Sequence, residues 1–456
     1  MVAEVPPVRR PHRIFTSPFI LFFGFAILII IGGLLLALPI SSTERVFTPP
    51  EIAFFTAVSA VTVTGHSVVN TSTYWSNFGL TVIFFLMLIG GLSFLAFAVF
   101  ILALLGQRST LSERLVLRET LGVDRMRGLR RIARNIILAA FLIYLIGAAA
   151  IFWRINGLGG LSFSESVWQS LFLSVSAFNG AGFFILPEPL LGSGLSRVAS
   201  DEALLMVLAA LIILGGIGWI TLVDLYRHRY FSRLALDTKL VITTSIFLWL
   251  SGAGILFLAE YSKPESHAEL SLLDRFVNSL FHSVSARSAG LSTLNFAEAQ
   301  DVTKLTYSGL MFIGGATGSV AGGIKVNAFA VLIAAVISSV KGRPQAEAFG
   351  REIAQTQLLR AITVAILGFL IICIAMIAFS LAEPDLDFLD LLFDTASAFG
   401  TVGFSTGIVP EMSVAGKAIL MGVMFIGRLG PLTLALALAP QEHTVYRFVQ
   451  ERVTIG

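Results

Sequence analysis

Eight long apolar runs dominate the amino-acid sequence and restrict the chain to a fold that crosses a membrane. About 20 apolar residues in helical form cover the roughly 30 Å of hydrocarbon in a bilayer. Six runs of about this length or more carry no charged residue: 18–40, 78–105, 135–153, 203–223, 240–259 and 361–382. Two further runs, 305–340 and 418–441, carry one interior charge each, Lys325 and Arg428. We therefore predict an all-α polytopic membrane protein with eight transmembrane helices.

The composition agrees with this class and excludes several others. Of the 456 residues, 56% are hydrophobic and 13% are charged, whereas about 25% are charged in ordinary soluble proteins. The single cysteine excludes a disulfide framework, and the net charge of +3 is too small to indicate nucleic acid as a partner. The Arg-rich segment 107–134 fits a loop at the membrane surface better than a nucleic-acid patch. The first apolar run is too long for a signal peptide, and we expect it to be a retained helix.

The basic residues are divided unevenly between the two sides of these runs, and this predicts the orientation. Most of the 31 Lys and Arg residues fall in the terminal segments and in the loops after the second, fourth and sixth runs. The other side collects most of the acidic residues. By the positive-inside rule, the N-terminal segment 1–17 and the C-terminal segment 441–456 are cytoplasmic. We expect a multi-pass protein of the cell membrane that contacts membrane lipid and has an acidic outer face.

A fourfold repeat organises the chain. The dipeptide Ser-Ala recurs in matching context at Ser59, Ser176, Ser285 and Ser397, at intervals of 117, 109 and 112 residues. A period of this length that covers nearly the whole chain indicates internal duplication. We therefore predict a single membrane domain, 1–456, built from four pseudo-symmetric units. The predicted repeats are 18–106, 134–224, 240–340 and 358–440.

Each repeat is expected to hold a short pore helix between its two long helices. The start signal is a capping pair, in which Ser, Thr or Asp is followed three residues later by Glu or Asp. One such pair is common by chance, whereas four at the same place in four repeats indicate a shared structure. The pairs are Thr48 and Glu51, Ser162 and Glu165, Ser271 and Asp274, and Asp387 and Asp390.

Each short helix is followed by a stretch that contains glycine, and we name these four stretches the glycine segments. Their residues are Thr62, Val63, Thr64, Gly65, Asn179, Gly180, Ala181, Gly182, Arg287, Ser288, Ala289, Gly290, Gly400, Thr401, Val402 and Gly403. Non-helical backbone at membrane depth is tolerated only where it is buried in protein or lines a watery cavity. Four related segments can therefore line one central ion pore.

The chemistry of such a pore is ion coordination. Backbone carbonyls can replace the water shell of an ion, and the partly negative C-terminal ends of the short helices favour a cation. Gly suits these positions because it reaches backbone angles that other residues avoid. The alternative is that these glycines only allow close packing of helices, which does not explain four copies after four capped helices.

Several motifs resemble those of a known family. The sequence Thr-Val-Gly-Phe at 401–404 resembles the selectivity filter of potassium channels. The four-repeat layout is similar to that of the Trk/Ktr/HKT superfamily of potassium transporters. More narrowly, the motifs at 176–182, 322–325 and 426–433 are similar to those of the Ktr membrane subunit. The resemblance covers essentially residues 18–456.

The resemblance implies potassium uptake through a channel-like pore in a homodimer, with potassium bound mainly by backbone carbonyls of the glycine segments. It implies control by a cytosolic ring of nucleotide-binding regulatory subunits, and we expect no nucleotide to bind this chain itself. Sodium is the second ion to consider, either as an activator or as a co-transported ion. Related transporters that admit sodium have Ser where this chain has Gly65, so Gly65 favours potassium. We expect the regulatory ring to dock on the basic loops 107–134, 224–239 and 341–360.

The second long run of the third repeat is unusually rich in glycine. Gly costs about 1 kcal/mol in a helix interior, so residues 314–323 are predicted to break the helix into a loop below the glycine segments. A phosphate-binding loop is the alternative, but no strand precedes it. The resemblance implies an intramembrane gate loop. The predicted gate residues are Gly314, Gly315, Ala316, Thr317, Gly318, Ser319, Val320, Ala321, Gly322, Gly323, Lys325 and Arg428.

Two charged residues accompany this loop. An Arg within a span costs at least about 2.5 kcal/mol on insertion scales, so Arg428 is expected to face protein or water. We predict that it projects into the pore beside the 314–323 loop and raises the barrier for potassium. The alternative is a packing salt bridge elsewhere. Lys325 is expected either to anchor the loop near the cytoplasmic edge or to have no part in holding it.

The sequence also predicts the surroundings of three other polar residues in or near the glycine segments. Arg287 would repel a cation, so its side chain is expected to point away from the ion path and to pair with Asp394. His66 and His282 are expected to pack between helices or to line the outer vestibule. No second ligand lies near either histidine at the spacing of a metal site.

These observations favour one function over two others. The preferred function is the potassium-selective translocating subunit of a Ktr-type uptake system, and the alternative is a sodium-permeable or non-selective cation transporter of the same fold. An intramembrane enzyme would need paired carboxylates, His-x-x-x-His or Gly-x-Ser-x-Gly within a span, and none occurs. We therefore predict that the chain is not an enzyme.

Overall fold

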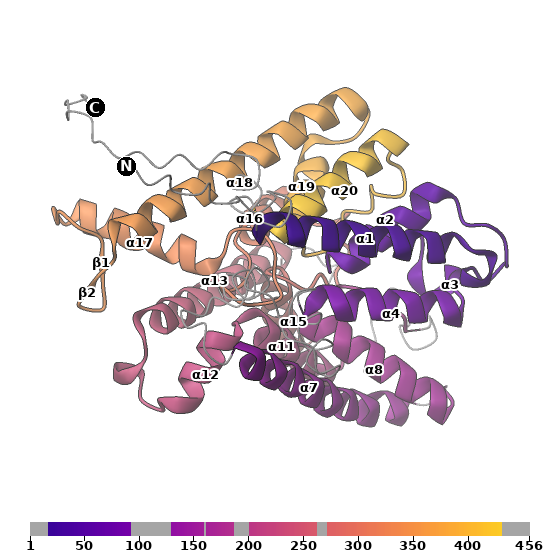
Figure 1. Ribbon diagram of the computed structural model, residues 1–456, viewed down its shortest axis with the longest axis horizontal. Coiled ribbons are helices and arrows are strands. Elements are labelled where there is room, and N and C mark those ends of the chain that lie inside the picture. The colour runs from indigo at the N-terminus through magenta and orange to yellow at the C-terminus, as the bar shows by residue number, and fades with distance from the viewer. Residues whose placement is uncertain (1–16, 93–128, 159–160, 187–199, 262–270, 431–456) are drawn as a thin grey trace, which may run out of the picture.

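The computed structural model describes residues 17–92, 129–158, 161–186, 200–261 and 271–430. Within these ranges the chain is almost entirely helical (Figure 1). Its strands in these ranges are β1 (Glu347–Ala348) and β2 (Arg351–Glu352), which pair antiparallel. Nearly all of the predicted cytoplasmic termini, 1–17 and 441–456, and most of the Arg-rich segment 107–134 lie outside the described residues.

The order long helix, short helix, extended segment and second helix occurs four times, which confirms the predicted fold class. The short helices are α2 (Pro50–Val61), α8 (Phe163–Asn179), α15 (Leu272–Ser285) and α19 (Phe388–Gly400). The helices before them are α1 (Ser17–Ala37), α7 (Leu129–Leu158), α13 (Leu236–Tyr261) and α18 (Gln355–Ala382). The helices after them are α4 (Asn77–Gly91), α11 (Glu202–Gly216), α16 (Asp301–Phe312) and α20 (Val414–Leu429). The short helix α3 (Thr71–Tyr74) lies before α4, while α12 (Trp219–Arg227) follows α11 and α17 (Val326–Val340) follows α16.

Contacts between repeats close these units into a ring. The helix that follows each glycine segment packs against the short helix of the next repeat: α4 against α8, α11 against α15, and α16 against α19. The ring closes because α20 of the fourth repeat packs against α2 of the first. Figure 1 shows α15, α16 and α19 near the middle of the molecule, with long helices around them. This arrangement directs the ends of all four short helices toward one centre.

Three of the four predicted helix starts are present. Ser162 and Glu165 form a reciprocal capping box, as do Ser271 and Asp274. The Asp387 carboxylate accepts from the first backbone N–H groups of α19. The prediction for the first repeat is wrong, because the residue that caps α2 is Pro49 and no side chain caps this helix. Pro at the first helical position lacks only an N–H that would be unpaired there in any case, so it can start a helix without such a cap.

The described helices cover the predicted spans only in part. Three are long and apolar enough to cross a membrane: Ala133–Gly157, Leu236–Glu260 and Gln355–Ala382. The run 203–223, predicted as one span, is instead two helices, α11 and α12, bent by 98°. Gly218, with φ of 86°, occupies the break. The runs 78–105 and 418–441 extend outside the described residues, so the total of eight spans stays a prediction.

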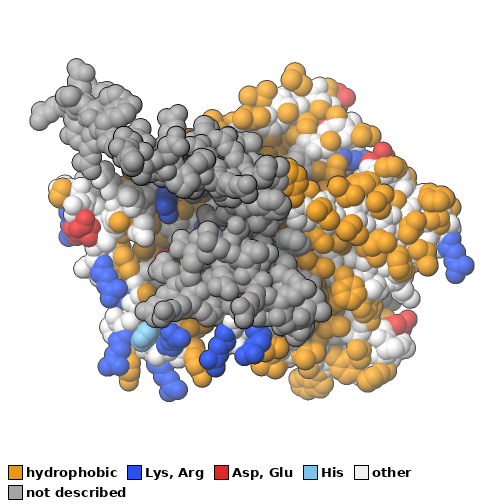
Figure 2. Space-filling view, in the orientation of Figure 1, with side chains coloured by type: hydrophobic (Ala, Val, Ile, Leu, Met, Phe, Trp, Pro, Cys, Tyr) orange, Lys and Arg blue, Asp and Glu red, His pale blue; other side chains and the backbone are white. Residues whose placement is uncertain are grey.

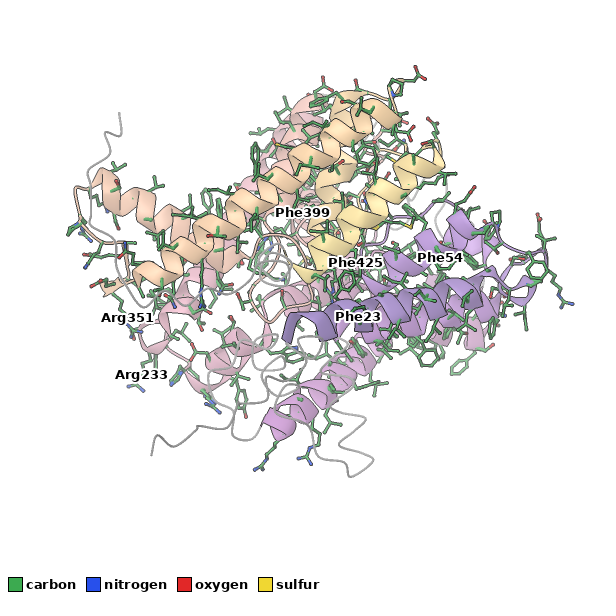
Figure 3. The ribbon with its side chains drawn as sticks, turned by 45° about the horizontal axis from the view of Figure 1, so that its top comes forward. Phe23, Phe54, Arg233, Arg351, Phe399 and Phe425 are labelled. Atoms are coloured by element: carbon green, nitrogen blue, oxygen red, sulfur yellow. The ribbon has the colours of Figure 1, made fainter. Side chains whose placement is uncertain are left out.

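On the face of the molecule drawn in Figure 2, apolar and basic side chains gather in different places. Figure 2 shows hydrophobic side chains gathered over the side of the molecule that α1 and α4 form. Basic side chains gather at the opposite lower edge, where α12 lies. Arg233 and Arg351 come from two different loops between repeats yet lie at the same edge, away from Phe399 near the centre (Figure 3). On this face the apolar side and the basic edge are distinct, as expected of a chain with lipid-facing helices and a basic end.

Candidate functional site

The glycines at the ends of the four glycine segments meet around one point. All four have φ in the left-handed region: 91° at Gly65, 70° at Gly182, 60° at Gly290 and 98° at Gly403. Each lies against the carbonyl oxygen of the residue before the next glycine in the ring. A Cβ added to Gly65 would lie 2.6 Å from the Ala181 oxygen, and one added to Gly182 would lie 3.0 Å from the Ala289 oxygen.

The other two glycines continue the same relationship and close the circle. A Cβ on Gly290 would lie 2.1 Å from the carbonyl oxygen of Val402, and one on Gly403 would lie 2.1 Å from that of Thr64. The carbonyl oxygens of Thr64, Ala181, Ala289 and Val402 therefore form a closed ring of four. Most of these positions admit no side chain larger than hydrogen without a shift of backbone, so glycine is required here by contact as well as by φ.

The four recurring serines hold this ring, a role that the sequence analysis did not assign to them. Ser59 and Ser397 each accept a hydrogen bond of 3.0 Å from the N–H of the ring glycine of their own segment. Ser176 and Ser285 donate at 2.8 Å to the carbonyl of the residue after their glycine. Their fourfold recurrence at fixed spacing was the available signal, because a buried hydroxyl at membrane depth needs a partner.

The third glycine segment differs from the others in its backbone. Val63, Gly180 and Thr401, each four residues after its serine, have φ of 52°, 68° and 49°. The third segment reaches its glycine one residue sooner and has no such residue at 287–289. Non-glycine residues in this region are strained, at a cost of order 1–3 kcal/mol each, and such strain concentrates at functional sites.

Several side chains of the glycine segments contact protein. The Asn179 amide donates at 3.2 Å to the Met87 carbonyl and accepts at 2.7 Å from the Tyr144 hydroxyl. The Thr62 hydroxyl bonds to that of Thr64 at 2.7 Å and to the carbonyl of Val58 at 2.7 Å. These contacts fix the segments through their side chains, which leaves the backbone to form the ring.

Glycines on the second helices allow the C-terminal ends of the short helices to pack closely against them. A Cβ on Gly90 would lie 2.1 Å from the Val61 carbonyl oxygen, one on Gly215 would lie 1.9 Å from that of Phe178, and one on Gly427 would lie 2.1 Å from that of Phe399. Each of these second helices ends within two residues of its glycine. In the third repeat α16 ends at Phe312, just before Gly314. The predicted break at 314–323 is therefore present, and the described ends of the other second helices lie at matching positions.

The 314–323 loop contacts two other repeats, the second and the fourth. Its Ala316 and Val320 N–H groups donate to the carbonyls of Gly216 and Gly215, at 2.9 and 3.3 Å. Gly322 donates to the hydroxyl of Thr401 at 2.9 Å. Ile313 and Ile324 form a parallel bridge at the base of the loop. The loop is thus fixed between the bend of the second repeat and the fourth glycine segment.

Arg428 and Lys325 both bind carbonyls of this loop. Arg428 donates to the carbonyl of Val320 and, on its other side, to that of Gly90. Lys325 donates to the carbonyl of Ala321. The predicted position of Arg428 beside the loop is present in the structure, and Lys325 contacts the loop as an anchor would. The effect of either residue on ion passage stays a prediction.

The predicted pairing of Arg287 with Asp394 is wrong. The Arg287 guanidinium donates to the carbonyls of Gly314, at 2.6 Å, and Ile313, at 3.4 Å. Asp394 accepts instead from the Ser405 hydroxyl at 3.1 Å and from a backbone N–H. The ends of a broken helix supply unpaired carbonyls, and these satisfy the guanidinium without an acid.

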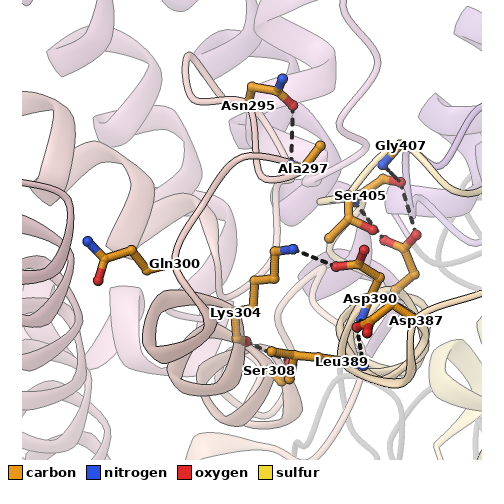
Figure 4. Close-up of polar contacts among 12 residues, drawn as sticks. Asn295, Ala297, Gln300, Lys304, Ser308, Asp387, Leu389, Asp390, Ser405 and Gly407 are labelled. Carbon is orange, nitrogen blue, oxygen red and sulfur yellow. Dashed lines mark hydrogen bonds and ion pairs between the residues drawn. The ribbon is translucent and has the colours of Figure 1, made fainter. Parts of the chain in front are cut away.

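Polar contacts behind the ring involve a pair of charges that the sequence analysis did not single out. Lys304 binds Asp390 at 2.7 Å, close to Ser405 of the loop after the fourth glycine segment (Figure 4). His282 bonds to the Asn278 carbonyl at 2.7 Å and receives the Thr293 N–H at 3.1 Å. This histidine therefore ties the third short helix to the loop that follows it. His66 is buried directly after Gly65.

Two cavities adjoin the candidate site. The first, of about 230 Å³, is lined by Gly182, Gly290, Gly403 and residues that follow them, such as Thr293 and Ser405. The second, of about 470 Å³, is lined by Thr317 and Lys325 at the 314–323 loop and by parts of α13, α17 and α18. One cavity therefore adjoins the ring and the other adjoins the loop.

Comparison with known proteins agrees with this geometry. Residues 28–447 match the TrkH family, described as cation transport proteins. Ktr system potassium uptake protein B of Bacillus subtilis is 37% identical over 442 residues, covering 97% of each chain. Potassium/sodium uptake protein NtpJ of Enterococcus hirae is 33% identical over 439 residues, covering 95% of this chain and 96% of that protein. The crystal structure of the potassium transporter TrkH from Vibrio parahaemolyticus has a TM-score of 0.70 at 20% identity, covering 96% of this chain and 87% of that chain.

Four repeats closed around a ring of carbonyl oxygens, together with these matches, define a membrane ion transporter and not an enzyme. More particularly, the chain belongs to the TrkH family of cation transport proteins, and its similarity to Ktr and Trk proteins confirms the resemblance seen in its motifs.

Proposed function

We propose that this chain is the potassium-selective translocating subunit of a Ktr-type uptake system. The observation that carries the proposal is the closed ring formed by the carbonyls of Thr64, Ala181, Ala289 and Val402. Rings of backbone carbonyls replace the hydration shell of an ion, and the short helices direct their partly negative ends to the same place. A cation without its water is stabilised there, whereas an anion is repelled.

The passage has two stages in this proposal. An ion enters from the cavity beside Thr293 and Ser405, exchanges water for the carbonyls of the glycine segments, and then meets the 314–323 loop. Arg428 and Lys325 hold this loop across the path through its carbonyls. Opening requires the loop to leave these contacts, after which the ion reaches the cavity beside Thr317.

The second candidate function keeps the fold and admits sodium, as a permeant or activating ion. It is favoured by the similarity to NtpJ, whose name includes both ions. Gly65 argues against the sodium candidate. A side chain at this position, such as the Ser of relatives that admit sodium, would lie against the Ala181 carbonyl oxygen and alter the geometry of the ring. Competition between the two ions in a flux measurement separates the candidates.

A cytosolic ring of nucleotide-binding subunits is proposed as the regulator. Two of the three basic loops expected to receive it meet in space: the rings of Phe231 and Phe349 lie 5.8 Å apart, and the Lys239 ammonium lies 5.5 Å from Phe231 and 6.0 Å from Phe349. Both aromatic side chains are about half exposed. Aromatic side chains that are exposed together on one surface are typical of a protein interface. Loss of co-purification when Phe231 and Phe349 are both replaced by Ser is the expected result.

A homodimer and cytoplasmic termini complete the proposal. The long helix α18 leaves Phe369, Ile374, Ile377 and Leu381 exposed on the isolated chain. Such a helix faces lipid or a second copy of the chain. The basic edge at α12 is expected to face the cytoplasm.

The test is growth at limiting potassium of a host that lacks its own uptake systems, with and without Gly65→Ser. Gly407→Ser is a matched control, because Gly407 has φ of 92°, close to that of Gly65, but has open space around it. We expect rescue by the wild type and by Gly407→Ser, and weak or sodium-sensitive growth with Gly65→Ser. Absence of rescue by the wild type, with a regulatory subunit supplied, would favour the sodium candidate. Equal growth of the wild type, Gly65→Ser and Gly407→Ser would show that Gly65 does not line the ion path.

A further inference from the structure

Arg287 occupies a position that is apolar in the other three repeats. It follows its serine by two residues, as Val61, Phe178 and Phe399 follow theirs. In those repeats the residue touches its own second helix through its carbonyl, at Gly90, Gly215 or Gly427. The third repeat has no helix at the equivalent place, because α16 ends at Phe312. A long side chain can fill the space that the missing helix would occupy.

The Arg287 side chain reaches the first residues after α16. Its Nη2 donates to the Gly314 carbonyl at 2.6 Å and its Nε to the Ile313 carbonyl at 3.4 Å. The residue is 4% exposed, and its guanidinium lies 5.8 Å from the ring of Trp249. Carbonyls at a helix C-terminus lack intrahelical partners and carry partial negative charge. Arg287 therefore places a full positive charge on the carbonyls of the backbone that directly follows α16.

Carbonyls are the hydrogen-bond partners of this charge. None of the ion pairs among the described residues includes Arg287, and Asp394 is occupied by Ser405 and a backbone N–H. Buried charges are retained only when they are paired or hydrogen-bonded. Removal of the guanidinium would leave the Gly314 carbonyl buried without this donor, so the start of the loop would lose a specific contact.

We propose that Arg287 is a positioning residue that couples the third glycine segment to the start of the 314–323 loop. The loop cannot move away from the ring without breaking the bond between Arg287 and Gly314. The same movement pulls on a segment in which Ala289 and Gly290, two and three residues after Arg287, belong to the ring. Opening of the loop and ion occupancy of the ring are thus linked. This inference rests on the proposed function, in which the segment binds ions and the loop is the gate.

The other end of the loop has a matching contact from the fourth segment, where Thr401 accepts from Gly322. The two contacts differ in strength, because hydrogen bonds to charged groups are roughly twice as strong as neutral ones. Arg287 should therefore dominate the coupling.

The test measures access to the loop by a thiol reagent. Cys373 is the only cysteine of the chain, so Cys373→Ser removes the background and Thr317→Cys places a reporter in the loop, at the wall of the larger cavity. The full chain, purified into nanodiscs, is treated with a methanethiosulfonate in potassium or in N-methylglucamine, and the modification rate is followed by mass spectrometry. Arg287→Gln, Arg287→Lys and the control Arg154→Gln are compared in this background. Arg154 also forms a forked contact, at 2.9 and 3.2 Å, but to Asp201 in the second repeat.

We expect Arg287→Gln to raise the modification rate at least about tenfold, the change that loss of a hydrogen bond to a charged group produces. The difference between potassium and N-methylglucamine should disappear. Arg287→Lys keeps the charge but lacks the fork, so an intermediate rate is expected, and Arg154→Gln should match the background. If Arg287→Gln does not fold, a rate for Arg287→Lys at least threefold above the background supports the coupling.

An unchanged rate in folded Arg287→Gln, or in Arg287→Lys where Gln does not fold, would overturn the proposal. An equal increase in Arg154→Gln would do so too, because it would indicate general loosening. The measurement does not require transport. If the wild type carries no potassium but Arg287→Gln still raises the modification rate, the proposed function is refuted, while the coupling of Arg287 to the loop still holds. Normal potassium flux with unchanged labelling would refute the coupling alone.

Discussion

The hydroxyl of Thr401 accepts a hydrogen bond of 2.9 Å from the backbone N–H of Gly322, so the fourth glycine segment touches the 314–323 loop directly. The contact is close on both sides, because a Cβ on Gly322 would lie 2.5 Å from the Thr401 hydroxyl oxygen. Thr401 also adopts φ of 49°, which is unusual for a β-branched residue. A strained residue in the segment thus supplies an acceptor to the loop below it.

Thr401→Val should loosen this loop. Val keeps the shape of Thr and removes the acceptor, so the buried Gly322 N–H loses its partner at a cost of about 1–3 kcal/mol. We expect ion flux without any regulatory subunit to rise by about tenfold, measured as tracer rubidium uptake into proteoliposomes. Thr401→Ser retains the hydroxyl and should behave like the wild type. Equal flux in Val and Ser variants would contradict the role of this hydrogen bond.

Arg428→Gln should also raise the flux that occurs without a regulator. Arg428 bridges the Val320 carbonyl of the loop and the Gly90 carbonyl of the first repeat, and Gln is too short to reach both. The preference for potassium over sodium should be unchanged, because neither contact involves the ring of Thr64, Ala181, Ala289 and Val402. Flux and ion competition in proteoliposomes are the measurements. An unchanged ion flux would show that Arg428 does not hold the gate closed. A changed preference for potassium over sodium would show that Arg428 takes part in ion selection.

The repeated architecture could be predicted from the sequence because its Ser-Ala dipeptides and glycine segments occur four times. The capping boxes at Ser162 and Ser271 depend on residues three apart, which the sequence displays directly. The bend between Gly216 and Gly218 was missed because glycine is common in transmembrane helices, so the glycines at 215, 216 and 218 did not by themselves indicate a break. The partner of Arg287 was missed because charge alone suggests an acid. Backbone carbonyls released by a helix break 26 residues away are visible only after folding.

Glu165 gives a prediction for the pH dependence of stability. The N–H and hydroxyl of Ser162 hold the pKa of this carboxyl below its usual value, because both hydrogen-bond to the ionised form. A lowered folded-state pKa stabilises the protein above the unfolded-state pKa, near 4.3 for Glu, and this contribution is lost as the pH falls through the folded-state pKa. Glu165→Gln should therefore unfold at a lower temperature than the wild type at pH 7, and the gap should narrow once the pH falls below the unfolded-state pKa and close below the folded-state pKa. A gap that is constant with pH would show that the charge does not matter.

Replacing a glycine of a second helix by Ala should change stability by an amount that depends on what the glycine contacts. Two glycines of α20 test this within one helix. A Cβ on Gly427 would lie 2.1 Å from the carbonyl oxygen of Phe399, whereas Gly422 has open space. Gly427→Ala should therefore push α20 away from α19 and destabilise the protein by about 1–3 kcal/mol, as overpacking does. Gly422→Ala should be neutral or stabilise it by up to about 1 kcal/mol, because Ala favours helix. Thermal unfolding of the purified protein in detergent compares the two, with ion flux as a second readout. Equal effects would mean that the contact between Gly427 and Phe399 does not set the position of the fourth short helix.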